Sequence, residues 1–181
     1  MTKLEMERRW LLKRVPATTW TEEIVIHQFY LHDAEGKRFR LRVSTDVATG
    51  THSWVWNRKE EVQPGVNEET ERDVAPAEAL ALLQNNAIEK DIEKIRRKAI
   101  ADGLTYEVDE YKHMALVVME VEFDTLDEFE QPRLMPEPFA AQVITELTYQ
   151  KAFSNYNLAE ASRYEQLKTT AQFTDLAIFA G

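Results

Sequence analysis

Charged residues of one sign stand two positions apart in several short segments of the sequence, with apolar residues between them. Carboxylates occur in this way in four segments, and arginine and lysine in two others. Hard divalent cations bind clustered carboxylates, and phosphate oxygens bind arginine and lysine. The residue types therefore predict a site that holds a polyphosphate bridged by a metal ion. The acidic pairs are Glu5 and Glu7, Glu69 and Glu71, Glu107 and Asp109, and Glu120 and Glu122, and the basic groups are Arg38, Arg40 and Arg42, then Lys94 and Arg96.

Each of these segments by itself is typical of a β-strand that has its polar face in water. The segment "KRFRLRVST" (37–45) places three arginines on one face and three apolar residues on the other. Residues two apart lie side by side on a strand, so these arginines repel one another unless negative charge lies opposite. Repetition of such segments, with the signs kept apart, favours an anionic ligand and metal ions. A plain β-rich domain with charge ladders in water is the alternative.

The elements that would position these residues follow from the two-residue alternation. The segment 91–100 is ambiguous in its period and is interpreted as a strand because the segments after it are strands. Proline near the start and a dense Ala/Leu pattern predict a helix at 75–87. The predicted strands are 3–12, 23–31, 37–45, 51–61, 68–74, 91–100, 102–111 and 114–123, and the other predicted helical segments are a single turn at 15–20 and helices at 138–147 and 154–168.

Eight antiparallel strands are enough to close into a barrel with a usable interior. The predicted fold is α+β: an eight-stranded antiparallel closed β-barrel with helices packed outside. Charged faces would then point inward, and apolar faces would pack outward under the helices. No shift in composition marks a linker. Residues 1–160 are therefore predicted to form the tunnel domain, and residues 161–181 a C-terminal helix or tail of the same domain.

Composition limits the classes of partner and metal site. The net charge is −10, from 32 acidic and 22 basic residues, which argues against a surface for double-stranded nucleic acid but allows a local basic pocket. The chain has no cysteine and four histidines, so oxygen atoms are the expected metal ligands. Neither a signal segment nor an apolar run long enough to cross a membrane is visible, so no membrane contact is expected and the cytoplasm is the expected compartment.

The charged segments resemble, in order, the motifs of the CYTH superfamily, the triphosphate tunnel metalloenzymes. "LEMERRWLL" resembles the "ExExK" first strand, "RFRLRV" the arginine strand, "NRK" the "TxK" strand and "EETE" the second acidic pair. "EKIRR" resembles "EKTRY", "YEVDEY" the "ELDxF" strand, "MEVEF" the "EVEF" strand and "TYQKAF" the closing "TxxKxY" element. The resemblance spans roughly residues 3 to 159. It implies a tunnel that binds inorganic or organic triphosphates together with Mg²⁺ or Mn²⁺.

The resemblance also implies roles for individual residues. The implied catalytic residues are Glu5, Glu7, Arg9, Glu69 and Glu71. The implied phosphate-binding residues are Arg40, Arg42, Lys59, Lys94, Arg96 and Lys151. The implied metal ligands are Glu5, Glu7, Asp109, Glu120 and Glu122, with Glu69 and Glu71 holding or orienting a second metal and the attacking water.

Five positions depart from the family pattern. Arg9 stands where the family has lysine, and arginine cannot act as a neutral base. Asn57 replaces threonine, His27 replaces an arginine, Phe153 replaces a tyrosine, and Arg38 is an added base. The interpretation is that the tunnel is kept while its substrate clamp is changed.

Three functions remain open from the sequence. Metal-dependent hydrolysis of a triphosphate is the leading hypothesis. A class IV-type adenylyl cyclase and a non-catalytic binder of nucleotides or polyphosphate are the alternatives. The sequence leaves open the identity of the triphosphate, the preferred metal, and whether two copies pair as a homodimer.

Overall fold

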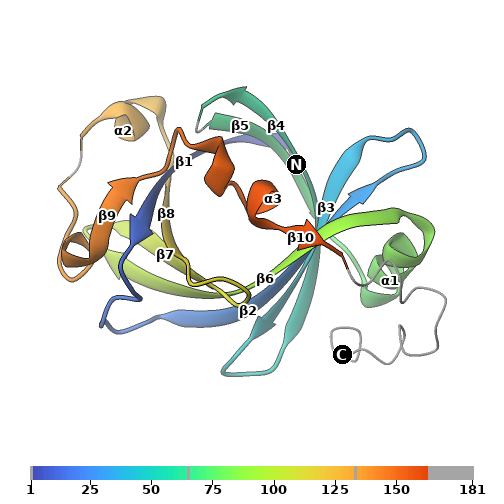
Figure 1. Cartoon of the computed structure of the whole chain (residues 1–181), viewed down its shortest axis with the longest axis horizontal. Helices are drawn as coiled ribbons and strands as arrows, with labels where there is room; N and C mark the ends of the chain where they lie inside the picture. The colour runs from blue at the N-terminus through green and yellow to red at the C-terminus, as the bar shows by residue number, and fades with distance from the viewer. Residues whose placement is uncertain (1, 65, 133, 163–181) are drawn as a thin grey trace.

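The computed structural model describes residues 2–64, 66–132 and 134–162. Within these ranges the chain forms a twisted antiparallel sheet that curls into a closed barrel, with short helices at its edges (Figure 1). The barrel strands are β1 (Thr2–Leu12), β2 (Glu22–His32), β3 (Arg38–Asp46), β4 (His52–Gln63), β5 (Val66–Asp73), β6 (Ala87–Ala101), β7 (Leu104–Tyr111) and β8 (Val117–Phe123).

These eight strands pair in the spatial order β6-β2-β3-β4-β5-β1-β8-β7, and β7 pairs with β6 to close the ring. Every pairing is antiparallel. The predicted α+β class and closed eight-stranded barrel are therefore confirmed. Segment 91–100, whose period was ambiguous, lies in β6 and pairs with both β2 and β7.

Most of the apolar core lies outside the barrel wall, on the outward parity of the strands. In β3, Phe39 and Leu41 are buried on this face. The helix α1 (Pro76–Asn85) covers it with Ala79 and Leu83, and all four side chains belong to one apolar cluster with Trp54. Figure 1 shows α1 outside the ring of strands. Burial of this face leaves the opposite parity, which carries the charges, for the barrel interior. A separate apolar cluster lies on the inward parity: Tyr30, Ile92, Tyr111 and Val118 share the parity of Gln28, Lys94, Asp109 and Glu120, and they cluster with Leu147 and Ala159.

The chain after β8 closes the structure in short pieces. The helix α2 (Leu126–Glu130) buries Phe129 against a second apolar cluster that includes Phe123 and Phe139. The short helix η1 (Ala140–Gln142) and the strand β9 (Val143–Glu146) follow, and β9 pairs with β1. The 3₁₀ helix η2 (Lys151–Phe153), the helix α3 (Asn155–Leu158) and the strand β10 (Glu160–Ala161) then run across one mouth of the barrel (Figure 1).

Three helical predictions are wrong. Residues 15–20 form no helical turn. Segment 138–147 contains η1 and β9 rather than one helix, because the C-terminal half of β1 has a free edge where β5 ends its pairing at Met6. The β-branched run of β9 fills that edge, and tertiary pairing overrides the helical pattern. 

Segment 154–168 forms only the four-residue α3 before β10 pairs with β6, so the long helix predicted there is also wrong over its described part. Its remainder, 163–168, lies outside the described residues, as does most of the predicted C-terminal helix or tail at 161–181. Among the described residues, no helix is both long and apolar enough to span a membrane.

Candidate functional site

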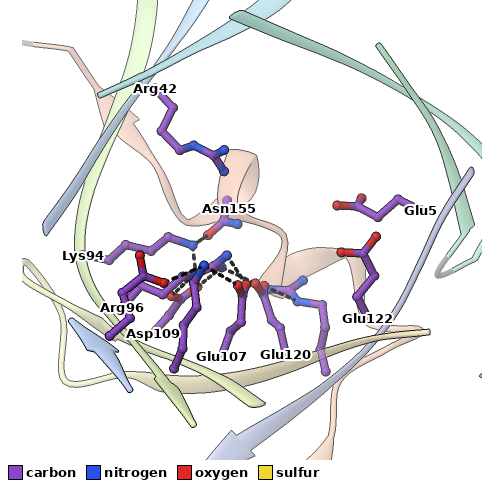
Figure 2. A network of polar contacts seen from close by, with 12 residues as sticks. Glu5, Arg42, Lys94, Arg96, Glu107, Asp109, Glu120, Glu122 and Asn155 are labelled. Carbon is purple, nitrogen blue, oxygen red and sulfur yellow. Dashed lines mark hydrogen bonds and ion pairs between the residues drawn. The ribbon is translucent and has the colours of Figure 1, made fainter. Parts of the chain in front are cut away.

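Charged side chains from seven strands face one cavity of about 190 Å³ inside the barrel, which we call the inner chamber. Figure 2 shows Lys94, Arg96 and their carboxylate partners along one wall, with Glu5 and Glu122 facing them. The chamber is lined by Lys3, Glu5, Glu7, Gln28, Arg40, Arg42, Lys59, Glu69, Glu71, Lys94, Arg96, Glu107, Glu120, Glu122 and Asn155. Seven of these described residues are carboxylates and six are bases. Eleven of the predicted site residues therefore meet in this chamber.

Arg96 on β6 is the hub of the first wall. It donates hydrogen bonds from Nε and Nη2 to the two oxygens of Asp109, each at 2.7 Å, and it also contacts Glu107 and Glu120. Burial alone would lower the pKa of the Arg96 guanidinium, but these three carboxylates outweigh burial and raise it. Arg96 therefore stays charged and fixes one wall of the chamber.

Lys94 lies on the same face of β6 and is almost fully buried, with 2% of its surface exposed. Its ammonium group contacts Asp109 and lies 3.4 Å from Asn155 Oδ1. Burial and the neighbouring Arg96 lower the pKa of Lys94, and Asp109 only partly offsets them. A polyanion in the chamber would stabilise the charged form of this lysine.

Glu120 on β8 is held by cations. Arg9 of β1 lies opposite it in the strand pairing and donates from Nε at 3.0 Å, and Arg96 contacts it from the other side. Burial raises the pKa of Glu120, but Arg96, Lys94 and Arg9 outweigh burial and leave the pKa well below its usual range. Arg9 also donates from Nη2 to the backbone oxygen of Phe153 at 2.6 Å. Both ends of its guanidinium fork are thus engaged.

The second wall joins β1, β3, β4 and β5. Lys59 contacts Glu5 and lies 3.6 Å from Glu69, which also lies 3.4 Å from Arg40. The pKa of Glu69 is lowered because Lys59 and Arg40 outweigh the effect of its burial. Asn57, also on β4, donates from Nδ2 to Glu69. This wall brings phosphate-binding candidates next to carboxylates, as the motifs predict.

Arg42 stands deeper on β3 and is only loosely paired, with Nη2 3.7 Å from Glu71. Burial, followed by repulsion from Arg40 and Arg96, lowers the pKa of Arg42 to about 10. Its Nε and that of Arg40 make no hydrogen bond to any described residue. Unused donors on two neighbouring arginines are suited to binding phosphate oxygens.

Glu7 differs from the other carboxylates of the chamber. It lies directly opposite Glu122 in the pairing of β1 with β8, and no described residue makes a hydrogen bond or ion pair with it. Burial, and then the negative charge of Glu120, raises the pKa of Glu7 to about 7. Glu122 is half-exposed and pairs with Lys3 at 2.9 Å. A carboxylate without a cation in this setting is suited to a divalent metal ion.

The side chains as they stand do not form a ready-made metal centre. Within residues 2–64, 66–132 and 134–162, no three His, Asp or Glu side chains are gathered closely enough to hold an ion. Lys59 forms an ion pair with Glu5, and Lys3 forms one with Glu122; these two glutamates flank Glu7. Both ammonium groups are carried by flexible side chains, so they can move away and let a divalent cation bind Glu5, Glu7 and Glu122. The donor set therefore fits a hard metal ion only after these two ion pairs open.

Three predicted site residues lie elsewhere. Asp109 has no exposed surface and supports Lys94 and Arg96 from behind the wall. Arg9 and Lys151 line a neighbouring cavity of about 350 Å³, which we call the outer chamber, and Lys151 pairs there with Glu61 at 2.5 Å. His27 lies on the outer face of the barrel beside Asp91, at 2.9 Å, so its departure from the family pattern does not alter the inner chamber.

Three residues of the inner chamber, Lys3, Gln28 and Asn155, were missed, and Glu107 was noted as an acidic residue of its strand but not predicted as a site residue. Lys3 has the same strand parity as Glu5, and this parity could have placed it inside. Asn155 comes from α3 and accepts a hydrogen bond from Tyr111 at 2.6 Å while it approaches Lys94. No sequence signal points to Asn155, because it reaches the site through the path of the C-terminal segment.

Comparison with known proteins shows a shared fold. No family model and no curated protein matches the chain. The solved structure of the inorganic triphosphatase NE1496 is similar, with 22% identity, a TM-score of 0.54, and coverage of 86% of this chain and 93% of that one. The protein bh2851 of Bacillus halodurans, a candidate adenylate cyclase, matches with 14% identity, a TM-score of 0.53, and coverage of 84% and 99%.

PH1819 of Pyrococcus horikoshii matches with 16% identity, a TM-score of 0.54, and coverage of 69% of this chain and 81% of that one. At these identities the likeness concerns the fold. The chain therefore has the closed tunnel fold that is found in an inorganic triphosphatase.

Proposed function

We propose that this chain is a member of the CYTH superfamily that hydrolyses a triphosphate in a metal-dependent reaction inside its barrel. The observation that carries the proposal is the inner chamber itself, where bases of β3, β4 and β6 and carboxylates of β1, β5, β7 and β8 meet in one enclosed space. A solvated charge ladder would face outward, whereas here the apolar faces lie outside and the charged faces inside.

The basic residues bind the phosphate chain in this proposal. Arg40 and Arg42 present free Nε donors, and Lys94 and Arg96 stand on the adjoining wall. Several positive charges around the terminal phosphoryl group stabilise the charge that moves onto its oxygens as the bond to the leaving group breaks. Water attacks in line as the bond to the leaving phosphate oxygen breaks. That oxygen takes the negative charge, and the proton lost by the water passes to a carboxylate of the chamber and on to solvent.

The carboxylates of β1 and β8 hold Mg²⁺ or Mn²⁺ in this proposal, through Glu5, Glu7 and Glu122, with Glu120 nearby. The ion would neutralise phosphate charge and help to orient the chain. Binding of the triphosphate favours opening of the Lys59–Glu5 pair, because the lysine gains phosphate oxygens as new partners. Glu69, 3.6 Å from Lys59, and Glu71 line the same chamber, and in this proposal they orient the attacking water or a second ion.

The test is phosphate release from tripolyphosphate, ATP and thiamine triphosphate, each with Mg²⁺, with Mn²⁺ and with a chelator. We expect release from at least one substrate with a metal and none with the chelator. Glu122→Ala and Glu5→Ala should abolish release while the protein stays folded. Glu35→Ala, on an exposed hairpin turn, is the control and should retain full activity.

Absence of phosphate release from all three substrates would overturn hydrolysis. Production of cyclic AMP from ATP in the same reactions would assign the cyclase alternative. Tight binding of a triphosphate without turnover would assign the non-catalytic alternative. The specific observation for it is that Nε and Nη2 of Arg9 already donate to Glu120 and to the backbone oxygen of Phe153.

A further inference from the structure

The outer chamber adjoins the inner chamber at the mouth of the barrel that α3 crosses. Glu7, Arg40, Lys59 and Asn155 line both chambers, so the two spaces lie side by side. The outer chamber has a volume of about 350 Å³, against about 190 Å³ for the inner one. A space of this size is at the lower end of the range for small-molecule pockets. It is larger than the chamber that would hold the phosphates.

The lining of the outer chamber differs in chemistry from that of the inner chamber. Charged groups make up nearly all of the inner lining, with Gln28 and Asn155 as the only neutral described residues there. The outer lining places seven neutral polar residues beside seven charged ones: Tyr30, Asn57, Asn67, Ser154, Asn155, Tyr156 and Asn157 beside Glu7, Arg9, Arg38, Arg40, Lys59, Glu61 and Lys151. Amides and hydroxyls both donate and accept hydrogen bonds, whereas ionised phosphate oxygens only accept. Beside its charged residues, the outer chamber therefore offers an organic group hydrogen-bond partners that are scarce in the inner chamber.

With Arg40, Arg38 lines the outer chamber from β3, and it is the more exposed of the two. Its guanidinium lies over the ring of Tyr156 on α3, with Cζ 3.8 Å from the ring centroid. Arg40 and Arg42 on the same strand face are paired with Glu69 and Glu71, but no described carboxylate forms an ion pair with Arg38. One face of this planar group is occupied by Tyr156. The other face is suited to stacking on a flat ring of a ligand.

Asn57 supplies a second and independent observation. It is 1% exposed and lines the outer chamber. Its Nδ2 donates to Glu69, which fixes the orientation of the amide, and its Oδ1 accepts no hydrogen bond from any described residue. A buried acceptor without a donor costs free energy. An ionised inorganic polyphosphate brings no donor to satisfy it, whereas an N–H or O–H of an organic group does.

We propose that the outer chamber binds the organic part of the substrate, a flat heterocyclic group with hydrogen-bond donors such as a nucleoside, stacked against Arg38. The substrate class is then an organic triphosphate rather than inorganic tripolyphosphate. This inference rests on the proposed function, because it assumes that the inner chamber holds the three phosphates.

The experiment compares Arg38→Ala with wild type on ATP, GTP, UTP and tripolyphosphate. Two quantities are measured: kcat/KM for phosphate release, and the Kd of a β,γ-imido analogue of ATP and of tripolyphosphate by calorimetry with Mg²⁺. We expect wild type to prefer a nucleoside triphosphate, and Arg38→Ala to lower its kcat/KM and weaken analogue binding by about tenfold. The change with tripolyphosphate should stay within about twofold.

Two further variants separate stacking from other roles. Arg38→Lys keeps the charge but loses the flat group, so it should lose the nucleotide preference as Arg38→Ala does. Arg58→Ala is the matched control, since Arg58 also lies over an aromatic ring, that of Trp56, but on the outer face of β4. Arg58→Ala should leave kcat/KM unchanged for both the nucleoside triphosphates and tripolyphosphate.

If Arg38→Ala lowered kcat/KM by the same factor for ATP and for tripolyphosphate, the inference would be overturned. An arginine that only holds α3 in place would affect every substrate alike. A wild-type preference for tripolyphosphate would overturn it as well. Loss of analogue binding in Arg38→Ala without turnover of any substrate would instead sustain the outer chamber and reject the proposed hydrolysis, so the two failures are distinguishable.

Discussion

Arg96 of β6 and Asp109 of β7 face each other in the strand pairing, and the guanidinium donates from Nε and Nη2 to the two carboxylate oxygens, each at 2.7 Å. Asp109 has no exposed surface, so this pair is sealed inside the wall of the barrel. Lys94 contacts the same carboxylate from the inner chamber. The carboxylate of Asp109 thus accepts hydrogen bonds from Lys94 and Arg96 and orients both phosphate-binding side chains.

Arg96→Ala should therefore cost stability as well as function. Removal of the guanidinium leaves Asp109, Glu107 and Glu120 close together with only part of their positive charge, so we expect a loss of about 3–5 kcal/mol in the free energy of unfolding. Urea unfolding at pH 7 measures it. Arg97→Ala is the control, because the partners of Arg97, Glu23 and Glu110, lie on the exposed outer face, and its loss should stay below about 1 kcal/mol. Equal losses of unfolding free energy in Arg96→Ala and Arg97→Ala would show that Arg96 is not needed to balance the buried carboxylates.

Glu7→Gln should stabilise the metal-free protein at high pH. The pKa of Glu7 is raised from 4.5 to about 7, so between these values the folded protein keeps a proton that the unfolded chain releases. The free energy of unfolding of the wild type therefore falls as pH rises through this window. Gln has no proton to lose, so the variant should melt about 7–13 °C higher than wild type at pH 8 and only about 2 °C higher at pH 5.

Thermal melts in the presence of a chelator at both pH values check this prediction. Glu35→Gln, on the exposed turn between β2 and β3, should show no such dependence on pH. A difference between Glu7→Gln and wild type that is the same at pH 5 and pH 8 would show that Glu7 is not held in the protonated form.

The affinity for a divalent metal ion should rise with pH, whereas the stability of the metal-free protein falls. A divalent ion needs the ionised form of Glu7, of which about a tenth is present one pH unit below its pKa. The affinity for Mg²⁺ or Mn²⁺ should therefore be about tenfold weaker at pH 6 than at pH 8, with release of protons on binding. Calorimetry in two buffers of different ionisation enthalpy measures both quantities. A pH-independent affinity would exclude Glu7 as a ligand.

Arg9→Lys should loosen the segment that crosses the barrel mouth. Arg9 bridges Glu120 and the backbone oxygen of Phe153, and lysine cannot keep both contacts in this geometry. We expect local protection of residues 151–158 against hydrogen exchange to fall by about 1–3 kcal/mol, with little change in β6 and β7. Exchange measured by mass spectrometry tests it. Unchanged protection at 151–158 would show that the C-terminal segment is held by its apolar contacts alone.

Much of the fold could be predicted because alternation is a local property. A strand whose parity separates arginine from leucine carries the information about its two faces in its own sequence, and eight such strands in succession allow few arrangements. Parity placed Glu5, Arg40 and Glu120 on the functional face, and Lys94 followed once segment 91–100 was interpreted as a strand from its neighbours; all four residues line the inner chamber. The helix predictions at 15–20 and 138–147 were wrong. Residues 143–146 pair with the free edge of β1, and residues 15–20 form no regular element; no local sequence pattern encodes either outcome.

The sequence by itself determined the charged faces, their order along the chain, and the closed eight-stranded barrel. Only the tertiary structure decided which cation holds which carboxylate, since these pairs join residues far apart in sequence, as in Arg9 with Glu120 and Lys59 with Glu5. It left Glu7 without a partner and brought Tyr156 of α3 over Arg38. Pairings of this kind depend on strand register and on the path of the C-terminal segment, which are set by packing of the whole chain rather than by any one segment.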